Sequence, residues 1–206
     1  KYKKQGRGGT GSNSTTLIED DYINQLFIGS TKECLLFITN IGRAYWMRIH
    51  EIPEAEKASR GQNIKGLLQV TADEEITTIV SLKEFSDDLY LFMITAKGIV
   101  KKVRSTEFQN ARTRGIIGIK LNDGDKLISA IPTTGSSDVM LISRRGKALR
   151  ITENSVRSMG RASCGIKGMK LSEGDEIAAA VKVEKDANMI LLTEKGVGKR
   201  ISFDLY

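Results

Sequence analysis

The sequence predicts an all-β fold built from repeated units of about four short strands. An apolar run followed by a turn that ends in glycine occurs four times, and a basic β-type run follows each turn. No amphipathic period of 3.6 residues runs through these segments, which argues against helices. A unit of roughly 50 residues has the size of a propeller blade, and blades must stack around a centre to bury both of their faces.

Each apolar run, with its turn and basic run, is predicted to form a β-hairpin, because the runs are short, rich in β-branched residues and bounded by turn chemistry. We expect residues 35–38, 91–94, 139–142 and 190–192 to be the inner strands. The turns end in Gly42, Gly98, Gly146 and Gly196. Glycine in the last position of a short hairpin loop suits a positive φ.

A segment with two glycines, called the tail from here on, follows each of the first three hairpins. The tails are residues 58–66, 112–118 and 162–168, and residues 5–11 offer a further copy. An acidic turn and another β-type run come after each tail, with the runs at residues 23–28, 76–80, 127–131 and 177–183. Each repeat therefore supplies a hairpin, a tail and one further strand.

The repeats predict one domain, divided into a tail at residues 1–18, repeats at 19–72, 73–122 and 123–172, and a partial repeat at 173–206. The first tail has no hairpin before it, and the last hairpin has no tail after it. We therefore expect either a piece of a longer repeat array, truncated at both ends, or a composite blade that the two ends complete.

The composition excludes several classes of protein. Cys34 and Cys164 are the only cysteines and lack a C-x-x-C partner, so we expect two buried free thiols rather than a zinc site or a disulfide framework. His50 is the only histidine, which removes His-pair metal sites and argues against a Ser/His triad. No apolar run has the length of a membrane span and no signal peptide opens the chain, so a cytoplasmic protein without a membrane partner is expected.

The charge favours a polyanionic partner, because 32 Lys and Arg outweigh 25 Asp and Glu for a net charge of +7. Basic residues gather just after the hairpin turns, at Arg43, Arg48, Lys97, Lys101, Lys102, Arg104, Arg144, Arg145, Lys147, Arg150, Lys195, Lys199 and Arg200. The tails add Arg7, Arg60, Arg112, Arg114 and Arg161. A residue type that recurs at one blade position recurs at one place on the rim, so we expect these side chains to be exposed on a curved basic track.

Such a track predicts sequence-independent binding and bending of duplex DNA, because a phosphate backbone can follow it and no base-reading helix or zinc finger is evident. The glycines of the tails allow a close approach of the backbone and offer N–H groups to phosphate. The alternatives are a free-standing architectural protein that compacts DNA and a propeller that binds proteins. An enzyme is the weakest hypothesis, since residues 8–11 lack the Gly-Lys-Ser/Thr ending of a P-loop and the acidic turns lack the spacing of a calcium loop.

Several segments together resemble the C-terminal domain of the A subunit of bacterial DNA gyrase. They are residues 5–11, 25–27, 35–37, 42–43, 45–46, 52–55 and 58–61. The resemblance implies a β-pinwheel, a propeller-like disc of repeated four-stranded blades that exchange strands, with DNA wrapped around its perimeter. It also implies a non-catalytic domain that supports negative supercoiling in the nucleoid. By this resemblance, DNA cleavage and the use of ATP and Mg belong to other parts of gyrase, so no cofactor is expected in this domain. The implied partners are double-stranded DNA, the remainder of the gyrase A subunit and the gyrase B subunit.

The family carries a box, Gln-Arg-Arg-Gly-Gly-Lys-Gly, that this chain matches in part. Gln5, Arg7, Gly8, Gly9 and Gly11 match the box and are predicted to contact DNA, whereas Gly6 and Thr10 replace basic residues. We expect the box to clamp one end of the bent DNA. The box is typically absent or degenerate in the equivalent domain of topoisomerase IV, which is the nearest alternative within this resemblance.

Overall fold

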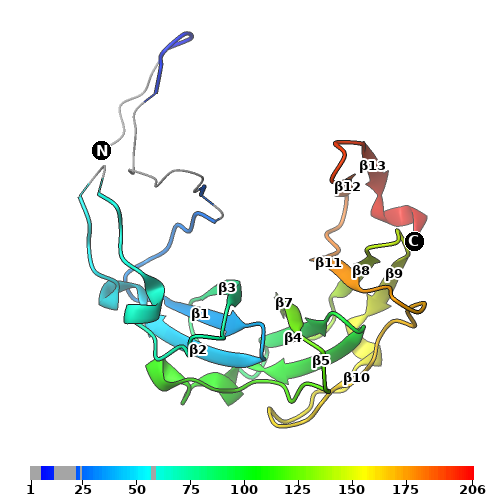
Figure 1. Ribbon diagram of the computed structural model, residues 1–206, viewed down its shortest axis with the longest axis horizontal. Coiled ribbons are helices and arrows are strands. Elements are labelled where there is room, and N and C mark those ends of the chain that lie inside the picture. Colours follow the sequence, from blue (N-terminus) through cyan, green and yellow to red (C-terminus); the bar gives the residue numbers. More distant parts are fainter. Residues whose placement is uncertain (1–5, 12–21, 24, 57–58) are drawn as a thin grey trace.

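The computed structural model describes residues 6–11, 22–23, 25–56 and 59–206. Its strands lie in four sheets that follow one another along an open arc (Figure 1). The described residues contain no α-helix, only short 3-10 helices. The predicted all-β architecture is therefore confirmed.

The element bounds follow the repeats. The strands are β1 (Cys34–Thr39), β2 (Arg43–Arg48), β3 (Ile76–Leu82), β4 (Tyr90–Thr95), β5 (Ile99–Arg104), β6 (Ile116–Ile117), β7 (Leu127–Thr133), β8 (Asp138–Ser143), β9 (Ala148–Thr152), β10 (Ile166–Lys167), β11 (Ile177–Lys182), β12 (Asn188–Leu192) and β13 (Gly198–Ser202). The 3-10 helices are η1 (Ile49–Glu51), η2 (Ile64–Gly66), η3 (Ser105–Phe108), η4 (Arg112–Arg114), η5 (Glu153–Ser155) and η6 (Phe203–Leu205).

The four predicted hairpins are present as the antiparallel pairs β1–β2, β4–β5, β8–β9 and β12–β13. The glycines that end their turns, Gly42, Gly98, Gly146 and Gly196, have φ values of 78°, 81°, 82° and 77°. An L-residue with a side chain rarely adopts this conformation, which is why glycine recurs at this position.

Neighbouring repeats exchange strands. The sheet orders are β3-β1-β2-β6, β10-β5-β4-β7, β11-β8-β9 and β12-β13. Strand β6 lies in the tail that follows hairpin β4–β5, yet it pairs with β2 of the preceding blade. Strand β10 likewise follows β8–β9 and pairs with β5. The outer strand of a blade thus comes from the tail of the next repeat.

The innermost strands are β3, β7 and β11, which differs from the prediction. Strand β7 lies against both β3 and β11 although the three belong to different sheets, and all three line the concave side of the arc (Figure 1). The predicted inner strands at residues 35–38, 91–94 and 139–142 lie one place further out, because the strand after each acidic turn pairs with their inner edge. The fourth, at residues 190–192, pairs only with β13.

The prediction of a strand at residues 23–28 is also wrong for the residues of this range that the structure describes. Ile23, Leu26 and Ile28 are exposed and lie outside any strand. The hairpin strand that follows, β1, already pairs with β2 and β3 on its two edges. The run therefore finds no free sheet edge beside its own hairpin.

The hydrophobic core lies between the blades. Leu36 and Ile38 of β1 pack in one cluster with Leu91 and Met93 of β4. The alternate residues of β4 join β8 in the next cluster. Because the hairpin strands are covered on both faces, they are continuously apolar rather than alternating. Cys34 is buried as expected, whereas Cys164 is only half-buried, and both are free thiols.

Two glycines provide a test of strand exchange. Gly115 has a φ of +69°, and a Cβ built on it would overlap the Tyr45 ring of the preceding blade. Gly146 has a φ of +82°, and a Cβ there meets nothing within 4 Å. Either alanine substitution strains the backbone, at about 1–2 kcal/mol, but only Gly115→Ala adds overpacking, at about 1–3 kcal/mol.

We therefore expect Gly115→Ala to lower the free energy of unfolding by more than Gly146→Ala does, by roughly the overpacking cost of 1–3 kcal/mol. Urea denaturation followed by tryptophan fluorescence measures both variants, since Trp46 lies beside this tail. Equal losses would show that the tail does not need its close contact with Tyr45.

Candidate functional site

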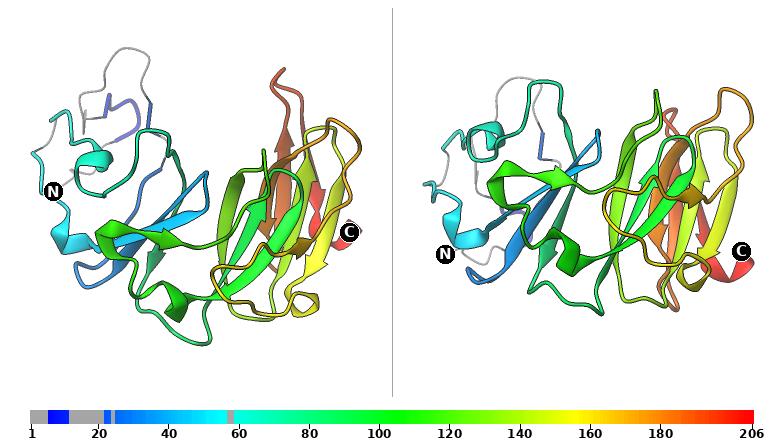
Figure 2. Two further views of the ribbon diagram at one scale, coloured as in Figure 1. Left: turned by 60° about the horizontal axis from the view of Figure 1, so that its bottom comes forward. Right: turned by 90° about the horizontal axis from the view of Figure 1, so that it is seen from below.

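Basic side chains gather on the outer edge of the arc. Two stretches around the tails at residues 112–118 and 162–168 run along this edge and contain no Asp or Glu (Figures 1 and 2). They are residues 109–120 and 154–170. Their exposed or half-exposed basic residues are Arg112, Arg114, Lys120, Arg157, Arg161, Lys167 and Lys170. We call these two segments the tail stretches.

The structure adds four basic residues that were not predicted as contacts: Lys120, Arg157, Lys167 and Lys170. All four are exposed: Lys120 follows β6, Lys167 lies in β10, and Arg157 and Lys170 come before and after β10. The signal that could have found them is the absence of acids in the tail stretches, which is visible in the sequence. Strand exchange then places these residues at the outer edge.

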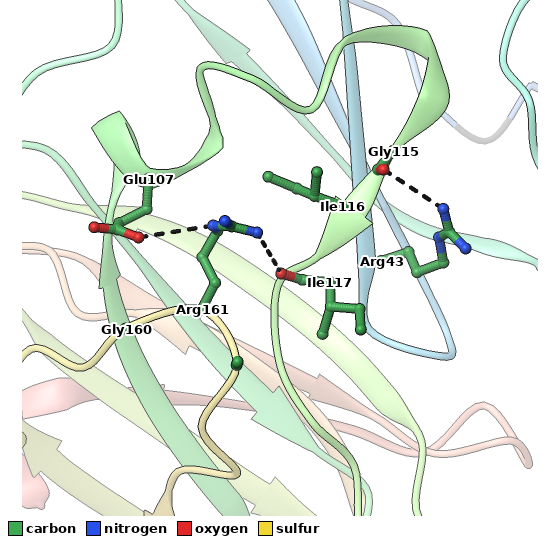
Figure 3. Close-up of a pocket in the computed structure, with 8 residues that line it drawn as sticks. Arg43, Glu107, Gly115, Ile116, Ile117, Gly160 and Arg161 are labelled. Carbon is green, nitrogen blue, oxygen red and sulfur yellow. Dashed lines mark hydrogen bonds and ion pairs between the residues drawn. The ribbon is translucent and has the colours of Figure 1, made fainter.

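A groove lies at the outer edge around β6, with a volume of about 610 Å³ (Figure 3). Its lining residues are Arg43, Glu107, Gly115, Ile116, Ile117, Gly160, Arg161 and Ala162. One lip of the groove is β6, and the other is the loop at residues 160–162. The lips come from consecutive repeats, so the groove exists only because the blades interlock.

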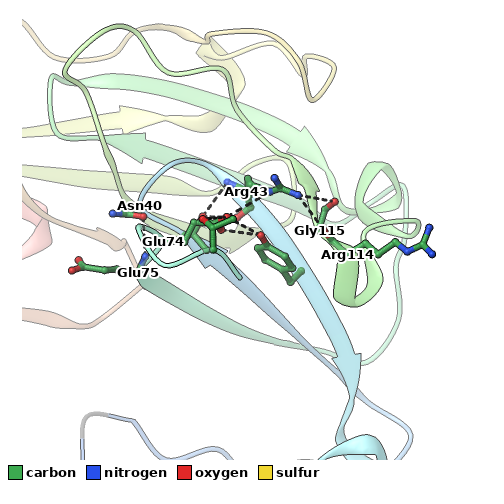
Figure 4. A network of polar contacts seen from close by, with 9 residues as sticks. Asn40, Arg43, Glu74, Glu75, Arg114 and Gly115 are labelled. Atoms are coloured by element: carbon green, nitrogen blue, oxygen red, sulfur yellow. Dashed lines mark hydrogen bonds and ion pairs between the residues drawn. The ribbon is translucent and has the colours of Figure 1, made fainter. Parts of the chain in front are cut away.

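Arg43 holds the start of β6 to its blade. Its Nη2 donates to the carbonyl oxygen of Arg114 at 3.0 Å and to that of Gly115 at 3.5 Å, and its Nε lies 3.9 Å from the buried carboxylate of Glu74 (Figure 4). Tyr45 donates its hydroxyl to the same carboxylate at 2.9 Å. Burial, followed by the hydrogen bond to Glu74, raises the pKa of Tyr45 to about 12, so the phenol remains a neutral donor. Arg43 is thus a structural anchor with a partly exposed side chain.

Arg161 approaches β6 from the other lip. Its Nη1 donates to the carbonyl oxygen of Ile117 at 3.3 Å, and its Nε lies 3.7 Å from the carboxylate of Glu107 (Figure 3). Glu107 is the acid that lines this groove. It neutralises part of the positive charge that Arg161 presents there.

Lys101 and Lys102 are buried, so the expectation that they lie exposed on the rim is wrong. The Lys101 ammonium donates to the carbonyl oxygens of Gly118 and Ser163, at 2.9 and 3.0 Å, and to that of Arg161. The Lys102 ammonium lies 3.9 Å from the Glu153 carboxylate and 5.1 Å above the Tyr90 ring. Two tails cover the Lys101 side of β5, and η5 with Glu153 covers the Lys102 side, so neither ammonium group reaches solvent.

The sequence holds a signal for this burial. Lys101 and Lys102 are the third and fourth residues after Gly98, and the same places after Gly42 are occupied by Tyr45 and Trp46. Tyrosine and tryptophan at equivalent blade positions indicate a packed environment. A comparison of repeats, rather than a local count of charges, would have predicted buried lysines.

The remaining predicted basic residues lie at the surface. Exposed side chains are those of Arg7, Arg48, Arg60, Lys97, Arg104, Arg112, Arg114, Arg144, Arg145, Lys147, Lys195, Lys199 and Arg200. Arg112 lies with its guanidinium 5.1 Å from the centre of the Trp46 ring. Arg150 is half-buried, with its Nη2 2.7 Å from the Asp138 carboxylate.

Two of the acidic turns lie against hairpin turns. The Oδ1 of Asp125 accepts from the backbone N–H of Lys97 at 3.0 Å, and that of Asp175 accepts from the N–H of Arg145 at 3.1 Å. Arg144 also pairs with Glu176 at 3.7 Å. The turn ends of hairpins β4–β5 and β8–β9 therefore carry mixed charge, whereas the two tail stretches at the outer edge contain no Asp or Glu.

The pKa of Asp175 reflects this capping role. Burial favours a higher pKa, but hydrogen bonds from Ser143 and from the N–H groups of Arg145 and Glu176 lower it overall. Because the folded-state pKa lies below the unfolded value, the Asp175 carboxylate stabilises the fold at pH values above the unfolded pKa of Asp. This stabilisation is lost as the pH falls through the lower, folded-state pKa. The charged Asp175 side chain therefore holds the turn between β8 and β9 at neutral pH.

The glycine-rich box is described only in part. Gln5 lies outside the described residues, while Arg7, Gly8, Gly9 and Gly11 are exposed. Gly9 donates its N–H to the carbonyl oxygen of Gly6 at 3.1 Å, which closes a turn. A Cβ at Gly8 or Gly11 would meet no atom within 4 Å, unlike one at Gly115. Packing among the described residues therefore does not require these two glycines.

Other types of site receive no support from the described residues. They contain no group of three or more His, Cys, Asp and Glu side chains placed to hold a metal ion. Nor do they include a helix of the length and apolarity needed to span a membrane.

Comparison with known proteins gives consistent matches. A family model described as "DNA gyrase C-terminal domain, beta-propeller" matches residues 35–83, 89–134, 137–184 and 187–206. The DNA gyrase A subunit of Treponema pallidum is 53% identical over 162 residues, covering 79% of this chain and 20% of that protein. The Escherichia coli homologue is 43% identical over 159 residues, covering 77% and 18%. The chain spans about a fifth of the length of these curated relatives.

Solved structures agree on the fold. The C-terminal domain of DNA topoisomerase IV superposes with a TM-score of 0.78 at 29% identity, covering 85% of this chain and 55% of that one. The DNA gyrase A C-terminal domain superposes with a TM-score of 0.74 at 32% identity, covering 98% and 66%.

Chemical labelling of lysines tests the burial of Lys101 and Lys102 directly. We expect an amine-reactive reagent to modify Lys120, Lys167 and Lys199 in the folded protein and to leave Lys101 and Lys102 unmodified, because both buried ammonium groups are engaged. All five should react in denaturant. Mass spectrometry of the digested protein measures the modification, and native labelling of Lys101 or Lys102 would contradict the structure.

Proposed function

Because the chain belongs to the family of DNA gyrase C-terminal domains, we propose that it binds duplex DNA without sequence preference and bends it along the tail stretches of its outer edge. The observation that carries this proposal is the basic charge of these two acid-free stretches. They come from different repeats, yet both lie along one convex edge. A duplex that follows this edge meets basic side chains from successive blades.

The physical argument is electrostatic. Lysine and arginine that neutralise phosphates release condensed counterions, which gives affinity without reading bases. The described elements offer strands, turns and short 3-10 helices at this edge, and none has the length of a major-groove recognition helix. Specificity would then come from the deformability of the DNA.

The wider role follows from the family. In the proposed function, the domain wraps DNA so that gyrase introduces negative supercoils, and it contributes no catalytic centre or cofactor of its own. Its partners are duplex DNA, the remainder of the gyrase A subunit, and the gyrase B subunit, in the bacterial cytoplasm at the nucleoid. Support comes from the gyrase relatives and from the fold.

Wrapping is tested by topology rather than by affinity. Relaxed circular DNA incubated with the protein and a nicking-closing enzyme should change its linking number in proportion to bound protein, because a wrapped segment traps writhe. Gel electrophoresis after protein removal measures the change. An unchanged linking number at saturation would leave DNA binding without wrapping.

The tail stretches are tested by charge reversal. We expect Arg114→Glu, Lys120→Glu and Lys167→Glu together to weaken duplex binding at low salt by at least about a hundredfold and to reduce the log–log salt slope by roughly 3. Fluorescence anisotropy across a salt series measures both quantities.

A second triple variant is the matched control. Lys126→Glu, Lys182→Glu and Lys185→Glu change the net charge by the same amount, but these exposed residues belong to the inner strands or the turns beside them. This control should lose much less affinity. Equal losses in the two variants would mean that overall charge, not the outer edge, determines binding.

Glu107 offers a change in the opposite direction. Glu107→Gln removes the acid of the groove and frees Arg161 from its ion pair, so we expect duplex affinity to rise about two- to tenfold. Stability should change little, because ion pairs between partly exposed groups contribute about 0–1 kcal/mol. The control is Glu173→Gln, an exposed acid in the turn before β11. A fall in affinity on Glu107→Gln would contradict the proposed role of the groove.

A further inference from the structure

A buried ammonium group lies beneath the outer-edge groove. Lys101 is fully buried on β5, and its three acceptors are the backbone oxygens of Gly118, Arg161 and Ser163. Gly118 directly follows β6, which forms one lip of the groove. Arg161 and Ser163 belong to the loop that forms the other lip. One side chain therefore joins both lips from below.

The Lys101 ammonium group has no hydrogen-bond partner in the described structure besides these three carbonyl oxygens. An ammonium has three N–H donors, and three carbonyl oxygens use them all. Lys101 cannot reach a phosphate from this position, and no carboxylate pairs with it within the ion-pair distance in the described structure. Its neighbour on the sequence, Lys102, is buried beside Glu153 instead. The charge of Lys101 is thus held by the two tails alone.

We propose that Lys101 is a positioning residue for DNA binding, whose ammonium fixes the spacing of the two tails and hence the placement of Arg161 and Arg114 on the outer edge. This inference rests on the proposed function. The link to Arg161 is direct, since its own carbonyl is an acceptor. The link to Arg114 runs along the chain through Gly115 and β6 to the Gly118 acceptor.

The protonation state of Lys101 gives the inference a pH dependence. Burial lowers its pKa to about 8; Cys164 and Glu107 favour the charged form and Arg161 opposes it. About nine tenths of the molecules would then carry the ammonium at pH 7 and about one tenth at pH 9. A neutral amine has two N–H donors for three carbonyls, so one of the three carbonyl oxygens loses its bond to Lys101.

The loss of this hydrogen bond is distinct from unfolding of the whole domain. The folded-state pKa lies below that of an unfolded lysine, so the unfolded chain binds more protons between the two values. The contribution of Lys101 to the free energy of unfolding therefore rises with pH across that window. DNA binding should weaken at alkaline pH while this group does not destabilise the fold.

The experiment compares Lys101→Met with Lys102→Met in the whole chain. We expect Lys101→Met to bind a short duplex about tenfold more weakly at pH 7 and to bend it less, by anisotropy and end-to-end energy transfer. Lys102→Met, equally buried but facing Glu153, should remain within about twofold of the parent. The parent should lose affinity about tenfold from pH 7 to 9.5, and Lys101→Met should show a flat profile.

Two outcomes would overturn the inference: a parent whose affinity does not change from pH 7 to 9.5, or a Lys101→Met variant with parental affinity, bending and pH profile. The parent profile requires no substitution at Lys101, so it decides even if that variant fails to fold. Amide hydrogen exchange without DNA separates the two proposals. If the parent binds no duplex, the proposed function fails, while faster exchange at residues 116–120 and 160–165 on raising the pH still supports the tether.

Discussion

Donation of an outer strand by the next repeat is the constraint on which the rest of the structure depends. The pairing itself is short, since β6 and β10 contain two residues each. It is reinforced at the hairpin turns, where the carbonyl oxygen of Gly42 accepts from the N–H groups of Gly118 and Ile119. The oxygen of Gly98 accepts in the same way from Gly168 and Met169. Gly42 and Gly98 therefore close their own turns and also accept hydrogen bonds from the next tail.

Strand exchange also determines which side chains reach solvent. A tail that must approach β2 or β5 closely needs glycine at the contact, as at Gly115 over Tyr45. The residues beside the contact then project from the outer edge, and in both tail stretches these are arginine and lysine without acids. The same coverage buries Lys101. One geometric requirement thus produces an apolar and glycine-rich inner side of the tail and a basic outer side.

Much of this fold could be predicted from the sequence, because hairpins and their turn glycines are local features that recur. The order of strands within a blade could not, since it depends on how repeats engage one another. Residues 76–80 were expected as a strand, but not as the inner neighbour of β1. Local charge also misled the prediction of exposure. Four basic residues between Lys97 and Arg104 suggest one solvated cluster, whereas Lys101 and Lys102 point into opposite covered faces of β5.

The anchors beneath the outer edge have a mechanical reason if the edge bends DNA. A bent duplex stores elastic energy of order 1–6 kcal/mol and pulls outward on whatever holds it. A two-residue strand contributes a few hydrogen bonds of about 1 kcal/mol each. Their sum is no larger than the elastic energy of the bent duplex, so strand pairing alone is a weak attachment. Arg43, fixed by Glu74 and bonded to the carbonyls of Arg114 and Gly115, ties the start of β6 to its blade. Lys101 ties the end of β6 and the next tail to β5. If the edge bends DNA, the half-exposed Arg43 and the buried Lys101 would thus add to strand pairing in holding the tails to the blades.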